Sequence, residues 1–140
     1  MMNLLIINKD IDAANLLKYQ IEKNNFSATH LENSNKAIEI CQSYFFDVIV
    51  FEFDEKHNLD SNLFKDLKET NPELIIILTV EFGSVDNTIK ACKNVADDYL
   101  SIPFGAEHLI FTIEKVKNTK ELIKENELLQ RKLKNGILFK

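Results

Sequence analysis

Four short apolar runs in this chain lead into residues that could line a binding site. The residues that follow the runs are Asn8, Lys9 and Asp10, then Glu52, then Thr79, and finally Ile102 and Pro103. A short apolar run without alternation is typical of a strand buried on both faces of a parallel sheet. In such sheets, ligands bind just outside the carboxyl ends of the strands. The carboxylate of Glu52, which ends the run Asp47–Glu52, is therefore the first candidate for chemistry.

Helical patterns alternate with the apolar runs and must position the residues that follow them. The expected strands are Leu4–Ile7, Phe26–His30, Asp47–Glu52, Leu74–Leu78 and Tyr99–Ser101. The expected helices are Ile11–Asn24 with Asp10 as its N-cap, one that Ser34 caps, one that passes Leu63 and Leu67, one that begins at Gly83 and Ser84, and Ala106–Lys134. Such alternation forms right-handed βαβ units around a parallel sheet. The pattern predicts an α/β, doubly wound (βα)5 domain of the flavodoxin-like kind, with strand order 2-1-3-4-5.

Composition argues against several classes of function for this segment. The 140 residues suffice for one domain, and the net charge of −5 argues against broad binding of nucleic acids or membranes. No apolar run approaches the ~20 residues of a membrane span, so we expect a cytoplasmic protein. The histidines His30, His57 and His108 lack ligand spacing, and no glycine follows the first strand, which argues against metal, dinucleotide and flavin sites. Cys41 and Cys92 lie in apolar helical patterns and are interpreted as small buried hydrophobes.

The residues at the strand ends, taken together, resemble those of the receiver domain of two-component response regulators. The resemblance covers about residues 3–117, and its most specific segment is Ala96–Phe104, around the fifth strand. It implies a cis peptide bond before Pro103. It also implies that Thr79 and Tyr99 hold the positions of the switch pair, which in this family reports the phosphorylated state.

This chain departs from the receiver pattern at the reaction centre. A working receiver uses two acids to bind Mg²⁺, an aspartate as phosphoryl acceptor and a lysine that neutralises charge. The two acid positions hold Asn8 and Lys9, the acceptor position holds Glu52 and the lysine position holds Ile102. The acidic pocket is thus reduced to Asn8, Lys9 and Asp10. We therefore expect a non-catalytic domain without Mg²⁺ or another cofactor.

Several interpretations of these residues stay open. One hypothesis is that the Lys9 ammonium pairs with Glu52 and permanently replaces the phosphorylated or metal-bound state. The alternative is that both side chains are solvated at the edge of the sheet. A further alternative is that the domain is still phosphorylated, on Glu52 or on Asp54. Thr79 and Tyr99 are likewise either a working switch or a packing pair with one arrangement.

The last expected helix, residues 106–134, is about 43 Å long, which exceeds what one small domain covers. Leu109, Ile110, Ile113 and Val116 form a stripe that we expect to pack on the sheet. Further along, the spacing of a two-stranded coiled coil is followed by Leu122, Asn126, Leu129 and Leu133. We predict a dimer through this second stripe, with a single fraying helix as the alternative. The expected organisation is a receiver-like domain over residues 1–117, a helical extension over 118–135, and the start of a further domain or a tail over 136–140.

These patterns favour a regulatory domain of a transcriptional regulator over an enzyme. A receiver followed by an extended helix rich in Glu, Lys and Leu resembles the amino-terminal part of nitrogen-regulation-type transcription activators. We expect a homodimer formed through the last helix, and through the face made by the fourth helix, fifth strand and fifth helix. An effector domain or a protein partner would act downstream. The alternatives are a stand-alone interaction module and an enzyme on a flavodoxin-like fold.

Overall fold

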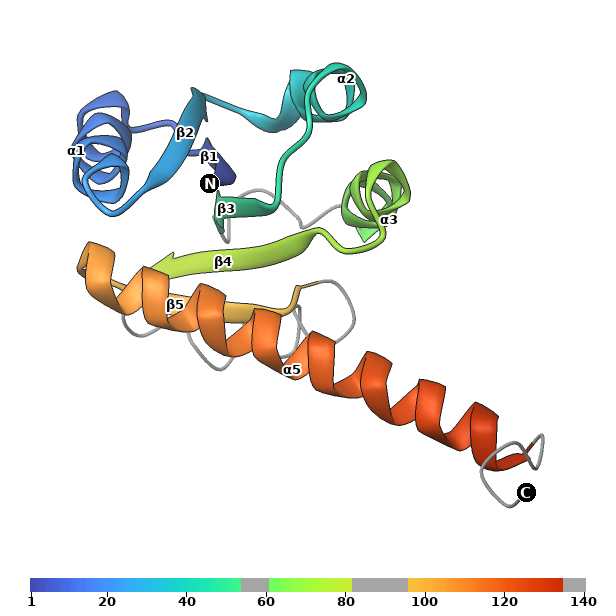
Figure 1. Cartoon of the computed structure of the whole chain (residues 1–140). Coiled ribbons are helices and arrows are strands. Elements are labelled where there is room, and N and C mark those ends of the chain that lie inside the picture. The colour runs from blue at the N-terminus through green and yellow to red at the C-terminus, as the bar shows by residue number, and fades with distance from the viewer. Residues whose placement is uncertain (54–60, 82–95, 135–140) are drawn as a thin grey trace.

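The computed structural model of the chain describes residues 1–53, 61–81 and 96–134 (Figure 1). Its elements are β1 (Met2–Ile7), α1 (Ile11–Glu22), β2 (Phe26–Leu31), the 3₁₀ turn η1 (Ser34–Lys36), α2 (Ala37–Ser43), β3 (Val48–Glu52), α3 (Ser61–Thr70), β4 (Ile75–Glu81), β5 (Asp98–Ile102) and α5 (Ala106–Lys134). Several predicted features lie outside the described residues. They are the helix that begins at Gly83 and Ser84, Cys92, Asp54, His57 and the segment 136–140.

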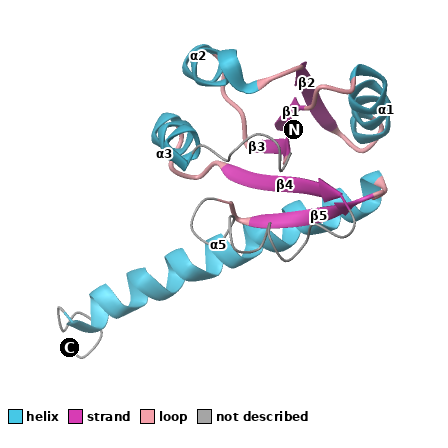
Figure 2. Ribbon diagram, turned by 180° about the vertical axis from the view of Figure 1, so that it is seen from behind, coloured by secondary structure: helices cyan, strands magenta, loops and turns pink. Residues whose placement is uncertain are grey.

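The described strands form one parallel sheet in the order β2-β1-β3-β4-β5 (Figure 2). This order confirms the predicted doubly wound, flavodoxin-like fold. The central strands are mostly apolar because helices cover both faces of the sheet. The carboxyl ends of the strands consequently meet at one edge.

Two groups of buried side chains cover the two faces of the sheet. One group takes its helical members from α1 and α5, and the other takes them from α2 and α3 (Figure 1). These members are Ala14, Ile21, Leu109, Ile113 and Val116 in the first group, and Ala37, Phe64 and Leu67 in the second. The prediction that the first part of the last helix packs on the sheet is confirmed.

Strand β4 continues two residues beyond Thr79, where the apolar run led us to expect its end. The extension is explained by pairing, because Val80 and Glu81 lie opposite Ser101 and Ile102 of β5. Thr79 therefore lies inside the ladder. Its backbone carbonyl accepts a hydrogen bond of 2.8 Å from the N–H of the residue that follows β3.

The expectation that Ser34 caps the second helix is wrong. The side chain of Asn33 accepts a hydrogen bond of 3.0 Å from the N–H of Asn35 and opens the 3₁₀ turn η1. Helix α2 begins only at Ala37 and has no side-chain cap bond. Asparagine readily accepts a bond from the backbone two residues on, so the turn begins one residue earlier than a serine cap would place it.

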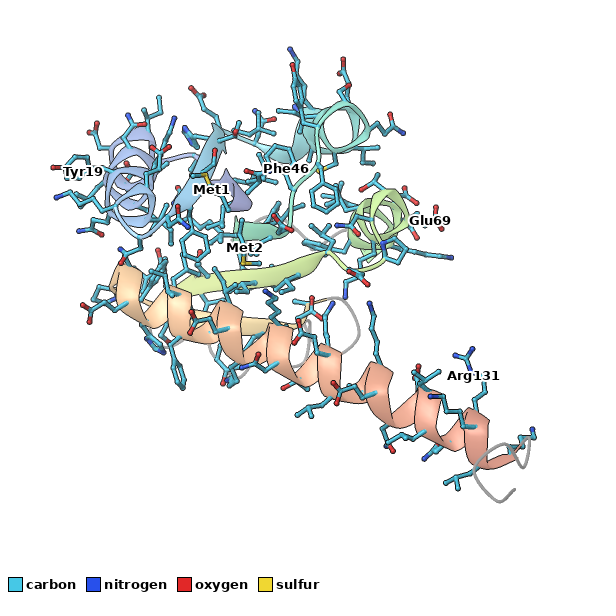
Figure 3. The ribbon with its side chains drawn as sticks, viewed as in Figure 1. Met1, Met2, Tyr19, Phe46, Glu69 and Arg131 are labelled. Carbon is cyan, nitrogen blue, oxygen red and sulfur yellow. The ribbon has the colours of Figure 1, made fainter. Side chains whose placement is uncertain are left out.

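Helix α5 continues past the sheet, as Figure 1 shows. Every residue from 121 to 134 is exposed except the half-buried Lys132. Arg131 lies on this part of the helix, away from the other elements (Figure 3). In the described part of the chain, no helix has the length and apolar character of a membrane span.

The carboxylate of Asp97 joins α3 and α5 to the sheet. One of its oxygens accepts a hydrogen bond of 2.8 Å from the N–H of Ile76 in β4. The other lies 3.3 Å from Nζ of Lys68 in α3 and 3.3 Å from Nζ of Lys120 in α5. Lys120 also donates to the carbonyl oxygen of Leu74 at 3.2 Å. The Asp97 side chain is 15% exposed, so solvent screens these ion pairs less than pairs on the open surface.

The core on the α2–α3 face can be tested at Phe64, which is 1% exposed and packs edge-on against Phe51 with ring centroids 5.3 Å apart. We expect Phe64→Ala to lower the free energy of unfolding by about 3–5 kcal/mol, because it removes buried apolar area and leaves a cavity. Urea denaturation measures the change. Phe45→Ala is the matched control, since Phe45 is 62% exposed and should lose less than about 1 kcal/mol. Similar losses for both variants would contradict this packing.

Candidate functional site

The ends of four strands bring four of the predicted site residues together. Glu52 ends β3 and lies opposite Thr79 of β4, while Ile102 ends β5 and Asn8 directly follows β1. These four residues line one hollow of about 190 Å³ at the carboxyl edge of the sheet. The structure thus forms a common site from residues that are far apart in the sequence.

The hollow has mostly apolar walls. Its lining includes Ile6 and Val50, two residues of the buried core, together with the polar residues Asn8, Glu52 and Thr79. Helix α1 contributes one wall with Ala13, Leu16, Leu17 and Gln20. The connection from β5 to α5 contributes the other with Ile102, Pro103 and Phe104. The peptide bond between Ile102 and Pro103 is cis.

Asn8 and Asp10 hold the turn between β1 and α1. Oδ1 of Asn8 accepts a hydrogen bond of 2.8 Å from the N–H of Asp10. Oδ1 of Asp10 in turn accepts one of 3.1 Å from the N–H of Ala13, so Asp10 is the N-cap of α1, as predicted. The carbonyl oxygen of Asn8 lies 2.7 Å from Nε2 of the half-buried His30. These contacts give Asn8, Asp10 and His30 structural roles.

Lys9 and Glu52 differ in their surroundings. Lys9 is exposed and is not among the residues that line the hollow, whereas Glu52 is half-buried and does line it. Both residues have interaction partners within the protein. Their pairing with each other stays a prediction. Among residues 1–53, 61–81 and 96–134, no group of three or more His, Cys, Asp or Glu side chains is arranged to hold a metal ion.

Thr79 and Tyr99 belong to neighbouring strands, but the register places them on opposite faces of the sheet. Tyr99 lies opposite Leu78, and Thr79 lies opposite Leu100. Because successive side chains of a strand alternate between faces, Tyr99 shares a face with Leu78 and Thr79 shares one with Leu100. Tyr99 accordingly packs on the α2–α3 side, while Thr79 is 3% exposed and lines the hollow.

Two other candidates lie outside the hollow. Cys41 is half-buried beside the α2–α3 core, and its burial raises the pKa of the thiol to about 11. Little thiolate is therefore present near neutral pH, which fits a small packed hydrophobe. His108 is exposed, and its carbonyl oxygen accepts a hydrogen bond of 2.9 Å from the hydroxyl of Thr112.

The predicted dimer residues lie on the exposed part of α5. Leu122, Leu129 and Leu133 are 65%, 51% and 46% exposed, and Asn126 is exposed as well. Sequence reasoning missed a different feature, the wall that Leu16 and Phe104 contribute to the hollow. Leu16 is 58% exposed. The sequence did contain one signal for this wall, because Leu16 is an apolar residue that lies off the buried face of the first helix.

Residues 4–114 of the chain match the family model of the response regulator receiver domain. Among curated proteins, a probable transcriptional regulator, ycf29 of Cyanophora paradoxa, is 30% identical over 144 residues, covering 99% of this chain and 66% of that protein. The C4-dicarboxylate transport transcriptional regulatory protein DctD of Rhizobium meliloti is 20% identical over 129 residues, covering 92% of this chain and 28% of DctD.

Solved structures share the fold. A response regulator receiver domain protein from Clostridium thermocellum superimposes with a TM-score of 0.74 and 22% identity, covering 88% of this chain and 99% of that one. NtrX from Brucella abortus superimposes with a TM-score of 0.76 and 20% identity, covering 92% of this chain and 30% of NtrX. The chain therefore spans less than a third of the length of DctD and of NtrX.

The structural role of Asp10 can be separated from any role as a charge. We expect Asp10→Ala to lower the free energy of unfolding by about 1 kcal/mol, because the N–H of Ala13 loses its cap. Asp10→Asn should retain most of this stability, since an amide oxygen caps nearly as well. Asp12→Ala is the matched control in the first turn of α1, where an exposed acid is removed and the cap remains. Equal losses for Asp10→Ala and Asp12→Ala in urea denaturation would refute the capping role.

Proposed function

The chain belongs to the family of response regulator receiver domains, and we propose that it is a receiver whose regulatory state does not depend on phosphorylation. The observation that carries the proposal is the composition of the hollow. Glu52 is the one charged side chain among the described residues that line it, and Ile102 holds the position at which the family resemblance implies a lysine. The described residues that line the hollow therefore include no cation.

Electrostatics support this proposal. A phosphoryl group brings a charge of about −1.5 to −2. Its transfer is catalysed mainly by positioned cations that neutralise the charge as it develops. In this hollow such a group would meet the apolar side chains of Val50, Ile102 and Phe104 and the carboxylate of Glu52. Lys9 does not line the hollow, and Asn8 supplies an amide in place of an acid.

The proposal extends to the metal, the switch pair and catalysis. Mg²⁺ prefers several oxygen ligands, and one oxygen of the Asp10 carboxylate serves as the cap of α1. A domain without the metal site has no means of catalysing its own phosphorylation, so we propose that it is not an enzyme. Thr79 and Tyr99 then form part of one packed arrangement, with Tyr99 on the α2–α3 side of the sheet.

Incubation with acetyl phosphate and Mg²⁺ tests this proposal. We expect no phosphoryl group on the wild-type chain by intact-mass spectrometry, and no change in its NMR spectrum with beryllofluoride and Mg²⁺. The matched positive control carries Asn8→Asp, Lys9→Asp, Glu52→Asp and Ile102→Lys together, which restores the family's residue types. This variant should gain the modification. Phosphoryl incorporation at Glu52 or Asp54 of the wild-type chain would defeat the proposal.

We further propose that this receiver belongs to a transcriptional regulator and dimerises through α5. Support comes from the relatives, which are named transcriptional regulators and of which DctD is several times longer than this chain. Support also comes from the helix, where Leu122, Leu129 and Leu133 are exposed at coiled-coil spacing around Asn126. A polar residue at one such position commonly sets the register of a two-stranded coiled coil. An effector domain or a protein partner downstream would then contact two copies of the receiver at once.

Two neighbouring leucines offer a matched test of the dimer. Leu129 and Leu128 are 51% and 49% exposed but lie about 100° apart around the helix, so only Leu129 belongs to the stripe. By analytical ultracentrifugation we expect the wild-type chain to have twice its 16.2 kDa mass. Leu129→Glu should shift it to monomer, whereas Leu128→Glu should remain a dimer. A monomeric wild-type chain, or equal dissociation by both variants, would rule out this interface.

A further inference from the structure

We propose that the hollow at the carboxyl edge of the sheet is a binding site for a small primary amine with a compact apolar body. The ammonium group would lie against Glu52 and Thr79, and the apolar body would lie between Leu16 and Phe104. The amine would serve as the input signal of the domain in place of a phosphoryl group. This inference rests on the proposed function in one respect, namely that Glu52 carries no phosphoryl group.

The size and the walls of the hollow suit a compact apolar body. Its volume of about 190 Å³ exceeds the ~150 Å³ of an engineered apolar cavity that takes up benzene. Two of its lining residues, Ile6 and Val50, belong to the buried core. Leu16, on the α1 wall, is 58% exposed, and a bound apolar group would remove part of that surface from water.

The polar groups of the hollow favour a cationic head. Glu52 is the one charged side chain among the described lining residues, and a carboxylate offers about four lone-pair sites on its two oxygens. It can therefore accept from a ligand while it keeps its partner within the protein. The hydroxyl of Thr79, on a side chain 3% exposed, provides a further acceptor beside it. Oδ1 of Asn8 already accepts a hydrogen bond from the N–H of Asp10, whereas Glu52 and Thr79 lie opposite each other on neighbouring strands.

Other classes of ligand fit this arrangement less well. An anionic ligand would place its charge beside the carboxylate of Glu52 in an apolar setting, where like charges repel strongly. A bare divalent cation would find a single carboxylate, that of Glu52, among the described lining residues, whereas Ca²⁺ sites use several oxygen ligands and Mg²⁺ sites need near-octahedral geometry. An amine also makes chemical sense at this position, because Ile102 replaces the residue whose ammonium the family resemblance implies.

Three probes with the same body and different heads test the charge preference on the full 140-residue chain. They are isopentylamine, isopentyl alcohol and isovalerate, each titrated by NMR at constant pH and ionic strength. A hydrogen bond to a charged group is worth more than a neutral one, so the amine should bind about tenfold or more tightly than the alcohol. Isovalerate should not bind measurably. Equal affinity for the amine and isovalerate, or no saturable binding of the amine, would overturn the proposal.

Substitutions test the location. Ile102→Lys puts a tethered ammonium into the hollow and should abolish binding of isopentylamine, whereas Leu128→Lys adds the same group on the exposed part of α5 and should leave it unchanged. Ala13→Phe narrows the hollow from the exposed side of α1 and should weaken binding, even if Ile102→Lys fails to fold. Glu52→Gln should bring the affinities for the amine and the alcohol close together. Unchanged amine binding in both Ala13→Phe and Glu52→Gln would place the ligand elsewhere and overturn the proposal.

The two proposals fail in different experiments. Phosphoryl incorporation from acetyl phosphate would defeat the phosphorylation-independent function, and competition between that modification and isopentylamine would then report whether both use the hollow. A chain that resists acetyl phosphate and shows no saturable amine binding would refute the amine site alone.

Discussion

The parallel register of the strands is the constraint on which the candidate site depends. All the described strands run in the same direction, so their carboxyl ends share one edge. The register then aligns the ends, with Ile7 opposite Phe51 and Glu52 opposite Thr79. A slip of one residue would move every side chain of a strand to the other face. Glu52 would then face α2 and α3 rather than the hollow beside α1.

The register is set by the core rather than by the site. Apolar residues of β1, β3 and β4 are buried on both faces, so a shifted strand would still bury apolar groups but would mismatch the helices that pack on them. The buried apolar surface that stabilises the fold belongs to these two clusters, and Asn8, Glu52 and Ile102 are not members of either. Replacing a metal ligand or a lysine at the edge consequently leaves the scaffold intact. This separation would allow the fold to persist when residues at the carboxyl edge of the sheet change.

The sequence allowed the sheet order and the bounds of the last helix to be predicted, because both follow from long apolar patterns. The apolar runs located Asp47–Glu52 and the other strands, and the alternation of strands with helices then predicted their order in the sheet. Local polar contacts were less predictable, since Asn33 and Ser34 are both good caps and only the backbone geometry selects Asn33. The end of β4 depended on its pairing with β5, which no local pattern contains. The hollow was unpredictable for a similar reason, because its walls come from α1 and from the segment after β5.

Helix α5 is attached to the domain in two ways, and the difference bears on how a signal would reach it. Its first part begins directly after Phe104, which lines the hollow, and is held by the burial of Leu109 and Ile113 in the core. Near its middle, Lys120 is held by the carboxylate of Asp97. Further on, the pair between Lys124 and Glu73 is largely exposed, and such pairs contribute little to stability.

A ligand shifts a conformational equilibrium only if it binds two arrangements with different affinity. An occupant of the hollow would contact Phe104 and so could distinguish arrangements of the segment that leads into α5. The core restricts movement of the helix before Val116, whereas beyond Lys124 few contacts with the described part of the domain oppose it. A small rotation near Phe104 would therefore be expressed chiefly at the exposed stripe of Leu122, Leu129 and Leu133. The same stripe is the one through which we propose that two chains pair, so the proposed dimer would respond to an occupant of the hollow.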